Sequence, residues 1–489
     1  MKVERDTCTG CGYCLLSCPV GAIESDGWAN ISEENCTLCG QCVSVCPNDA
    51  ISLEAPVKEP ECRYEREYDA VIIGAGIGGL MAGAALAKHG RRVGIFEKLA
   101  FIGGRYTEID YAGYSVTTAA WTSLGPKCNI GEFLQDVGAE VDYISLGDKG
   151  CNQQFSIRFK DGREFPSVQA MLTRQDWRAF LRALVKGRKL DLQDASTRDY
   201  IEEYVQNDDL MATINALVGT ASGMTVDNFP ASEYIQITRD TAKAGLDFAF
   251  AVGGVRTLIE ALGGVITAHG GQIFSRTEVS RVLLEHGETK GIVLKNGDQI
   301  EAQTVIHNGG IGRFVKLVGL ENLPSTYRAR VEKLVPLDCA AIILGTTEPL
   351  LTKAPMLMTP GTNRVVGLFA PTFLDASVAP PGKHMVDVFL RLYSRDRARE
   401  LEFAMEDLRA LFPNLDDILD IVVPMFFTGA WTGTESCQTF GQVGEQRLDP
   451  RSPIRNLYLV GMDVVGSGAA GDLIPVGVRR LLEYLECSI

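Results

Sequence analysis

The hydrophobic pattern of the chain is most regular between residues 68 and 97. Four apolar residues at 70–73 precede a glycine-rich turn at 74–79, and a segment rich in alanine leads to a second apolar run at 93–96. Continuous apolar runs of this length predict parallel strands that are buried on both faces. The small residues between them predict a helix. The pattern therefore predicts a strand–turn–helix–strand unit in an α/β fold.

The turn of this unit has the spacing of a dinucleotide-binding site. Gly74 permits the tight turn, Gly76 lets a pyrophosphate approach the backbone, and Gly79 lets the helix pack close to the sheet. Gly78 belongs to the same turn, and the helix that follows would point its N-terminus at the phosphates. Glu97 ends the second strand, where an acid that binds a ribose is expected. We interpret the unit as a dinucleotide site rather than an ordinary glycine-rich turn.

Hydrophobic patterns elsewhere predict the remaining elements. A helix is expected at 255–262, strands at 272–274, 278–284, 291–294, 304–307 and 456–460, hairpin turns at 286–287 and 296–297, and a final helix. The intervening segments predict helices near 174–187, 200–218 and 394–411 and strands at 340–345 and 385–392. A second Gly-x-Gly-x-x-Gly pattern at 466–471 is followed by one helix only, without a second strand or a ribose-binding acid. We therefore do not interpret it as a second nucleotide site.

Eight of the 14 cysteines fall within the first 46 residues, in two copies of one motif. Each copy has the pattern Cys-x2-Cys-x2-Cys-x3-Cys-Pro. In such runs three cysteines hold one iron–sulfur cluster and the fourth holds the other cluster. The expected ligands are Cys8, Cys11, Cys14 and Cys46 for one cluster and Cys36, Cys39, Cys42 and Cys18 for the second. Zinc is the alternative for paired cysteines, but it needs fewer ligands than this doubled motif offers.

Composition and charge limit the classes of function. The chain of 489 residues has a net charge of −15, which argues against nucleic acid and anionic membranes as partners. No apolar run approaches the roughly 18 residues that a membrane span needs, so no transmembrane segment is expected. The N-terminus lacks the apolar core of a signal peptide. Together with cysteines at metal-binding spacing, this favours a reducing cytoplasmic location.

Residues 1–58 resemble a bacterial ferredoxin with two [4Fe-4S] clusters, a small α+β domain. The segments 18–23 and 46–51, which begin with Cys-Pro, match the strand-forming segments of that family. A module of this size has little core of its own, so cluster assembly would supply much of its folding energy. A charged linker that contains proline is expected at 59–67, with Cys62 as a bystander thiol.

The rest of the chain resembles the FAD enzymes that include phytoene desaturases, amine oxidases and protoporphyrinogen oxidase. The resemblance implies FAD rather than NAD, a Rossmann-like FAD-binding domain of the GR2 type, and a mixed α+β cap over the substrate cavity. Besides the glycine turn, it rests on matching residues in five places: Glu97 with Lys98, Gly103-Gly104-Arg105, Val279, Gly461 and Asp463.

The same resemblance assigns roles to these residues. Gly104 and Arg105 would run beside the pyrophosphate, where the arginine can donate charge-assisted hydrogen bonds. The backbone of Val279 would meet the adenine. Gly461 and Asp463 would approach the ribityl chain and the flavin ring.

The resemblance also divides the chain into domains. The FAD-binding domain is expected at 68–110, 251–320 and 446–489, and the cap at 111–250 and 321–445. Near the end, the sequence departs from the small-residue run that is usual in these enzymes. Both Asp472 and Leu473 therefore stand as candidates for a contact with the flavin.

The sequence identifies no catalytic acid or base, and a flavin needs few protein groups for its redox chemistry. His307 ends an expected strand, where a structural role is favoured. Six aromatic residues could line the substrate cavity, although core packing is the commoner role for each of them: Tyr114, Trp121, Phe248, Phe250, Trp431 and Phe440.

Two functions fit these features. In the first, an iron–sulfur flavoprotein oxidoreductase passes electrons between two [4Fe-4S] clusters and FAD, for anaerobic redox of a carbon–carbon bond in an unidentified organic substrate. In the second, the chain is an electron-transfer subunit that couples NAD(P)H or ferredoxin to a partner enzyme. Both predict a redox partner protein, either a ferredoxin or another subunit. Any NAD(P)H would have to meet the flavin from the cap side, because no separate NAD(P) domain is evident.

Overall fold

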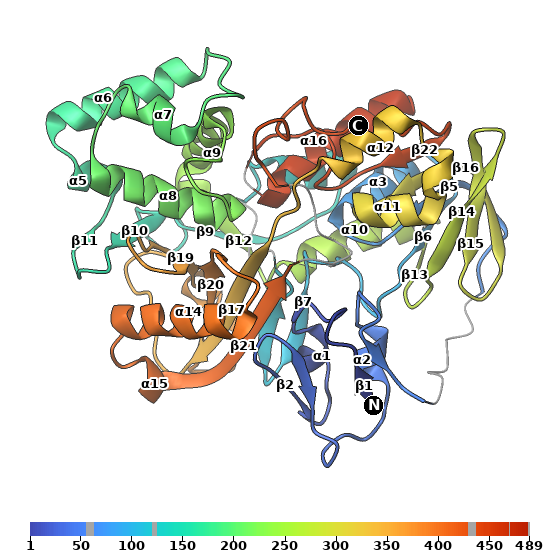
Figure 1. Cartoon of the computed structure of the whole chain (residues 1–489), viewed down its shortest axis with the longest axis horizontal. Helices are drawn as coiled ribbons and strands as arrows, with labels where there is room; N and C mark the ends of the chain where they lie inside the picture. The colour runs from blue at the N-terminus through green and yellow to red at the C-terminus, as the bar shows by residue number, and fades with distance from the viewer. Residues whose placement is uncertain (55–62, 120–124, 429–436, 469, 488–489) are drawn as a thin grey trace.

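The computed structural model describes residues 1–54, 63–119, 125–428, 437–468 and 470–487. Figure 1 shows three parts: a small N-terminal module at the bottom, a sheet with its helices on the right, and a second sheet with its helices on the left. The predicted linker 59–67 lies partly outside the described residues. Its last residue already belongs to the first long strand, β5, which begins at Glu67.

The N-terminal module repeats one backbone path twice. Its elements are, in order, β1 (Lys2–Val3), α1 (Tyr13–Leu16), β2 (Ile23–Ser25), β3 (Ala29–Ile31), α2 (Gln41–Ser44) and β4 (Ile51–Ser52). β1 pairs with β4 and β2 pairs with β3, both antiparallel. Gly12 and Gly40 precede the two helices with φ angles of 79° and 78°, a left-handed conformation that favours glycine. The repeated cysteine motif thus has a repeated backbone.

The sheet on the right of Figure 1 carries the glycine-rich turn. Its strand order is β13 (Gln272–Phe274), β6 (Val93–Phe96), β5 (Glu67–Ile73), β16 (Gln299–His307), β15 (Glu288–Leu294) and β14 (Val279–Glu285), with β22 (Leu457–Leu459) also paired to β16. β13, β6, β5, β16 and β22 are parallel, and β14 to β16 form an antiparallel meander. The turns of the meander fall at the predicted residues 286–287 and 296–297.

Both faces of this sheet are covered, which explains the continuous apolar runs. Ala70 and Ile72 of β5 belong to a core that includes α3 (Ile77–Lys88) and α10 (Arg256–Ala268). Their neighbours on the opposite face belong to a second core, which includes α11 (Ile311–Val318). Successive side chains of a strand point to opposite faces, so a strand between two cores has no polar positions.

The sheet on the left of Figure 1 forms the cap. Its order is β11 (Glu164–Phe165), β10 (Phe155–Arg158), β18 (Met356–Met358), β19 (Val365–Phe369), β20 (His384–Leu390), β17 (Cys339–Thr346) and β21 (Leu419–Phe427). One face packs against α14 (Arg397–Leu411) and α15 (Leu415–Ile418). The other face turns toward the glycine-rich sheet, so the predicted mixed cap contains a sheet of its own.

Five helices complete the upper part of the cap: α5 (Val168–Met171), α6 (Arg174–Gly187), α7 (Thr197–Glu202), α8 (Asp208–Ser222) and α9 (Ala231–Ala244). The single helical stretch that the sequence predicts near 200–218 is wrong in detail, because α7 and α8 are separate helices. Asn207 causes the break by capping α8, and its Oδ1 accepts a hydrogen bond from Leu210 N at 2.9 Å. Likewise α14 begins at Arg397 rather than at 394, after the cap residue Asp396.

Short elements connect these parts: β7 (Glu108–Tyr111), β8 (Tyr114–Thr117), α4 (Asn129–Val137), β9 (Tyr143–Ser145), β12 (Ala249–Ala251), α12 (Ser325–Glu332), α13 (Pro371–Leu374) and the C-terminal α16 (Ile474–Tyr484). α16 packs against α3 and α4. Within the described ranges, no helix combines the length and the apolar character that a bilayer crossing requires.

Arg397 of the cap docks the N-terminal module. Its Nη1 donates to the carbonyl oxygens of Cys8 at 2.9 Å and Gly27 at 3.1 Å. Its guanidinium lies 4.2 Å from the ring centre of Trp28. Burial lowers the pKa of Arg397, although the cation remains charged far above neutral pH. The module is therefore held by charge-assisted hydrogen bonds and a cation–π contact.

We expect Arg397→Ala to weaken this docking by about 2 kcal/mol, since it removes two hydrogen bonds from a charged donor. Limited proteolysis of the folded protein should then release the N-terminal module faster. Arg399→Ala is the matched control, because Arg399 lies on the same helix but is exposed. Equal proteolysis of both variants would contradict the role given to Arg397.

Candidate cofactor and substrate site

The eight N-terminal cysteines surround two small cavities. Cys8, Cys11, Cys14 and Cys46 line one cavity, and Cys18, Cys36, Cys39 and Cys42 line the other. Each cavity receives three cysteines from one motif and the fourth from the other, which is the grouping that the spacing predicts. All four cysteines of the first cavity are buried, whereas Cys39 of the second is exposed. We call them the inner site and the outer site.

The surroundings of these cysteines fit iron–sulfur clusters. Ala22 N donates to Cys18 Sγ and Ala50 N donates to Cys46 Sγ, each at 3.2 Å, so both repeats make the same contact. Hydrogen bonds from the backbone to sulfur stabilise thiolate ligands and tune cluster potentials. Four cysteines around each of two cavities, with the same backbone hydrogen bond in both repeats, suit two iron–sulfur clusters.

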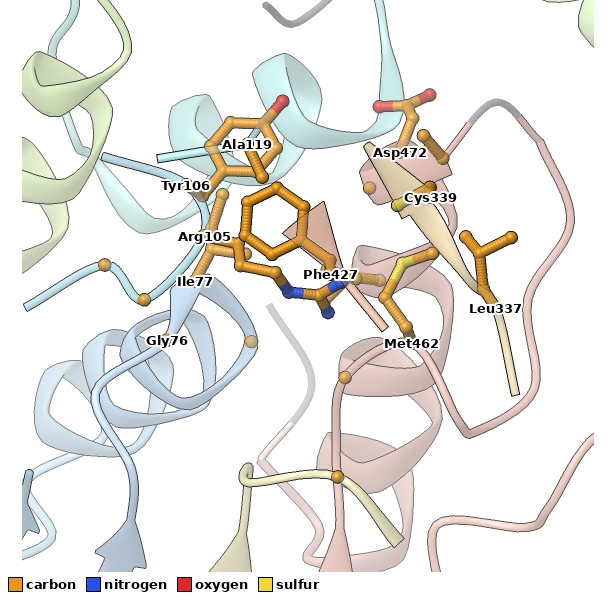
Figure 2. A pocket seen from close by; sticks show the side chains of 18 of the residues that line it. Gly76, Ile77, Arg105, Tyr106, Ala119, Leu337, Cys339, Phe427, Met462 and Asp472 are labelled. Carbon is orange, nitrogen blue, oxygen red and sulfur yellow. The ribbon is translucent and has the colours of Figure 1, made fainter. Parts of the chain in front are cut away.

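A cavity of about 450 Å³ lies between the glycine-rich sheet and the cap. Figure 2 shows Arg105 reaching into it toward Phe427 and Met462, with Asp472 and Cys339 on the side away from Tyr106. The glycine turn, the 103–105 turn and the segments around 308 and 461 line one end. Residues from the cap line the other end. The cavity is thus shared by the two parts that the sequence predicts for a cofactor and a substrate.

The N-terminus of α3 is open toward this cavity. Gly76 is its N-cap residue, and no side chain caps the first N–H groups. Gly103 N donates to Ala75 O at 2.7 Å, which holds the 103–105 turn beside the glycine turn. Gly104 has a φ of 62°, and Arg105 projects from it into the cavity. Uncapped N–H groups and a nearby arginine together form a suitable site for a pyrophosphate.

Asn308, which the sequence analysis missed, fills the space left by the glycines. A Cβ on Gly76 would lie 2.6 Å from Asn308 Nδ2, and one on Gly78 would lie 2.8 Å from Asn308 Oδ1. A Cβ on Gly79 would lie 2.4 Å from Gly74 O, so this glycine allows the helix to approach the strand as expected. The signal for Asn308 was its place at the end of β16, next to the strand that leads into the glycine turn.

Glu97 and Lys98 follow β6 and have different surroundings. The Glu97 carboxylate accepts hydrogen bonds from Ala75 N at 2.7 Å and Leu99 N at 2.8 Å. Burial raises the pKa of Glu97, and these two N–H groups oppose the shift. Lys98 Nζ instead donates to Pro47 O at 3.1 Å and to Asp49 at 2.7 Å. The sequence predicts Lys98 as a cofactor contact. In the structure its side chain binds the N-terminal module at the edge of the cavity.

The residues predicted from the C-terminal motif also line the cavity. Val279 is buried at the start of β14. Gly461 follows β22 with a φ of 111°, and Asp463 Oδ2 accepts a hydrogen bond from Ile311 N at 2.8 Å. This bond ties the C-terminal turn to the first turn of α11. The structure therefore brings Val279, Gly461 and Asp463 to the same end of the cavity as the glycine turn.

Asp472 and Leu473 have different positions. Asp472 lines the cavity and caps α4, where its carboxylate accepts hydrogen bonds from Ile130 N at 2.9 Å and Asn129 N at 3.2 Å. Burial raises the pKa of Asp472 to about 6, although both N–H groups act against the shift. Leu473 is fully buried and is not part of the cavity wall. Of the two candidates, only Asp472 reaches the cavity.

The cap end of the cavity is apolar. Its walls include Phe155, Phe248, Leu337, Met356, Met358 and Phe389. Among the described residues, every Asp, Glu, Lys, Arg and His of the cavity wall comes from the glycine-rich part of the chain rather than from the cap. A charged end and an apolar end of this kind suit a dinucleotide next to an apolar ligand.

The inner cysteine site lies directly beside the cavity. Pro47, the residue after Cys46, lines both the inner site and the large cavity. Tyr13 OH, from the same site, donates to Thr118 O at 2.8 Å. Thr118 Oγ1 in turn donates to Gly104 O at 3.0 Å. A short run of packed and hydrogen-bonded groups therefore joins the inner site to the predicted pyrophosphate position.

Comparison with protein families agrees with this geometry. Residues 77–471 match the model of the flavin containing amine oxidoreductases. The chain belongs to this family. Residues 7–61 match a 4Fe-4S dicluster domain, ahead of the flavin part. The protein is therefore an FAD-dependent oxidoreductase of the amine oxidoreductase family that carries a 4Fe-4S domain.

Individual relatives align with most of the chain. An uncharacterized protein of Methanocaldococcus jannaschii is 29% identical over 85% of this chain and 98% of its own length. A zeta-carotene-forming phytoene desaturase of Myxococcus xanthus is 25% identical over 85% of this chain and 93% of its own. The crystal structure of an oxidoreductase from Methanosarcina mazei superposes with a TM-score of 0.76, at 27% identity, over 85% of this chain and 99% of that one.

The predicted cavity aromatics have mixed outcomes in this flavin oxidoreductase. Phe248 lines the cavity, whereas Tyr114 and Phe250 are fully buried outside its wall and Phe440 is exposed. Trp121 and Trp431 lie outside the described residues. His307 lines the cavity with Nε2 3.0 Å from Gly310 O, and burial lowers its pKa to about 4. A neutral histidine held by its own turn fits the structural role that the sequence favours.

Glu108, which the sequence analysis also missed, holds the N-terminus of α10. Its carboxylate accepts hydrogen bonds from Val255 N at 2.9 Å and Arg256 N at 3.4 Å. Burial raises the pKa of Glu108 to about 7, and the buried Asp387 nearby has its own pKa raised by burial and by the charge of Glu108. Glu108 is the first residue of the short strand Glu-Ile-Asp-Tyr, and nothing in that pattern indicated this role.

The raised pKa of Glu108 predicts a loss of stability with rising pH. The folded protein keeps this proton up to about pH 7, whereas the unfolded chain releases it near 4.5. The raised pKa of Glu108 therefore imposes no loss of stability below pH 4.5. Stability is lost progressively as the pH rises from 4.5 to 7. Relative to the parent, Glu108→Gln should gain about 2–3 kcal/mol of unfolding free energy between pH 5 and pH 8.

Anaerobic urea unfolding at the two pH values measures this difference. Glu260→Gln, at an exposed position of α10, is the matched control and should show no gain. A Glu108→Gln variant whose unfolding free energy changes between the two pH values as much as that of the parent would contradict the raised pKa of Glu108.

Proposed function

We propose that this protein passes electrons between two [4Fe-4S] clusters and FAD in order to reduce or oxidise a carbon–carbon bond of an apolar organic substrate. The observation that carries the proposal is the divided cavity. One end has the groups that suit a dinucleotide, the other end is apolar, and the inner cysteine site adjoins the charged end. The name of the Myxococcus xanthus relative, a phytoene desaturase, supports an apolar substrate.

Each group of residues has a proposed task. The N-terminus of α3 and Arg105 would bind the pyrophosphate, and Glu97 would bind the adenosine ribose, beside Val279. Asp463 would approach the ribityl chain from the C-terminal turn. The two cysteine sets would hold one cluster each. When bound, FAD can exchange two electrons with a substrate and one with a cluster, so it joins the two kinds of redox partner.

The apolar walls would select the substrate and exclude water. Met356, Met358 and Phe389 bring flexible and aromatic surface to the cap end of the cavity, where an unsaturated hydrocarbon could lie. Asp472 lines the wall, has a pKa that burial raises to about 6, and lies beside Cys339 in Figure 2. It is the best-placed group for a proton that accompanies electron transfer.

An anaerobic single-turnover experiment tests this function. Fully reduced protein with its cofactors is mixed with a panel of polyenes and isoprenoids in detergent, and the flavin absorbance and the products are followed. The proposal predicts flavin reoxidation by an apolar unsaturated compound without any added protein. If oxidation occurs only after a partner enzyme is added, the chain is an electron-transfer subunit instead.

A narrower cavity should impair this reaction selectively. Ala341 of β17 lies in the cavity wall, so Ala341→Phe should lower kcat/KM at least tenfold by filling space that the substrate needs, while leaving the FAD and iron contents unchanged. Ala170→Phe, at an exposed position of α5, is the control and should behave like the parent. Parent-like turnover by Ala341→Phe would argue against the apolar end as the substrate site.

A further inference from the structure

The two cysteine sites differ in their access to solvent. At the inner site Cys8, Cys11, Cys14 and Cys46 are 8%, 9%, 8% and 9% exposed, and the cavity of the flavin part lies next to it. At the outer site Cys39 is exposed and Cys18 and Cys36 are partly exposed. A protein that exchanges electrons with the outer site can approach it directly, whereas the inner site is covered by the module and the flavin part.

The surface over the outer site has an apolar centre. Leu38, next to Cys39, is 59% exposed, and Val20, which lines the outer site, is 48% exposed. Leu38 has a φ of 55°, where the first repeat has Gly10 at 73°. A left-handed conformation is unfavourable for a leucine, and neither its burial nor its packing accounts for it. The position therefore presents an apolar side chain to solvent at a conformational cost.

The rim of this surface is acidic. Glu33 and Glu34 are exposed and lie just before Cys36. No lysine or arginine occurs between Arg5 and Lys58, and Lys2, next to Met1 of the outer-site wall, forms an ion pair with Glu4. Arg276 of the flavin part donates a hydrogen bond to Gln41, which lines the outer site. The exposed carboxylates of Glu33 and Glu34 are complementary to a basic partner.

We propose that a basic one-electron carrier protein docks on Val20 and Leu38, with Glu33 and Glu34 at the rim, and exchanges electrons with the outer site. The inner site then connects the outer site to the flavin, so electrons follow the order carrier, outer site, inner site, flavin, or its reverse. This inference rests on the proposed function. Electron-transfer complexes use small interfaces, and complementary charges at their rim speed association.

Each docking event moves one electron. When the protein is the donor, the outer site loses one electron and the metal centre of the carrier gains it, with no bond made or broken. Two such events remove the two electrons of a fully reduced flavin, whose protons pass to solvent. With a reduced carrier the same steps run in the opposite direction.

The test uses anaerobically reduced protein with its cofactors and oxidised cytochrome c, a basic haem protein that accepts one electron. The second-order rate of haem reduction is measured by stopped flow over a range of salt concentrations, and binding is measured by calorimetry at low salt. For Glu33→Gln/Glu34→Gln we expect a rate that is about five- to tenfold lower at low salt, weaker binding and a flatter salt dependence. For Leu38→Gly we expect a rate about tenfold lower at every salt concentration.

The control variant Glu402→Gln/Glu406→Gln removes the same charge from exposed positions of α14 and should match the parent. Parent rates and binding in both outer-site variants, or an equal loss in the control, would overturn the docking surface. A different result would refute the proposed function: cytochrome c oxidises the clusters of the parent at the expected rate while the flavin stays reduced.

Discussion

The Cys14→Ser variant is expected to lose about half of its iron and to slow electron transfer between the clusters and the flavin by more than a hundredfold. Cys14 lies at the inner site, 8% exposed, and the inner site adjoins the flavin cavity through Pro47. A serine oxygen is a poor ligand for an iron–sulfur cluster, which prefers thiolates. Without the inner cluster, the outer site would have no short route to the flavin.

Iron analysis and anaerobic rapid mixing measure both effects. The variant should also unfold at a lower temperature, because cluster assembly contributes to the folding of so small a module. Cys151→Ser is the matched control, since Cys151 lies in the cap and donates only to carbonyl groups of Gln153 and Lys353. A Cys14→Ser protein with full iron and parent-like electron transfer would contradict the assignment of the inner site.

Gly79→Ala has the second large expected effect, which is loss of FAD with a marked loss of stability. A Cβ at this position would lie 2.4 Å from Gly74 O, well inside van der Waals contact. The obstacle is backbone, so α3 would have to move away from β5. Its N-terminus would then no longer face the predicted pyrophosphate position, and we expect FAD affinity to fall at least tenfold with a loss of about 2–3 kcal/mol of stability.

Gly264→Ala provides an exacting control for this prediction. Gly264 is an exposed helical glycine of α10, and a Cβ there would meet no atom within 4 Å. The same substitution should therefore stabilise the protein by about 0.5–1 kcal/mol through helix propensity and leave FAD binding unchanged. FAD titration and thermal unfolding of both variants measure these effects. An FAD affinity of Gly79→Ala equal to that of the parent would show that α3 does not hold the cofactor.

Much of this architecture was accessible from the sequence, because its signals are local. The two cysteine motifs have strict spacing, and four cysteines that line one small cavity leave few ways to group them. The runs at 70–73 and 93–96 predicted central strands, since only a strand covered on both faces is apolar at every position. Gly74 to Glu97 formed one continuous unit, so the order of its turn, helix and strand could be predicted without distant parts of the chain.

The features that the sequence did not predict depend on contacts between residues far apart in the chain. Tyr13 bonds to Thr118 and Arg397 bonds to Cys8, and no periodicity along the chain encodes either contact. The same holds for Lys98, whose position after Glu97 suggested only a cofactor contact. Local pattern also did not reveal which aromatics reach the cavity: Phe248, just before β12, lines the wall, whereas Phe250 within β12 does not.

The break between α7 and α8 shows a different limit. Both segments have helical patterns, and a pattern of apolar positions does not record where the backbone turns. The cap residue Asn207, followed by two aspartates in the first turn of α8, was the available signal.

The central claim is that the clusters and the flavin of this chain exchange electrons within one molecule. The most direct measurement is an anaerobic flash experiment, in which a light-driven donor reduces the clusters with one electron and the absorbance of clusters and flavin is followed. The account predicts that the flavin gains electrons as the clusters lose them, at a rate that does not depend on protein concentration. Clusters that stay reduced beside an oxidised flavin, or a rate that rises in proportion to protein concentration, would contradict it.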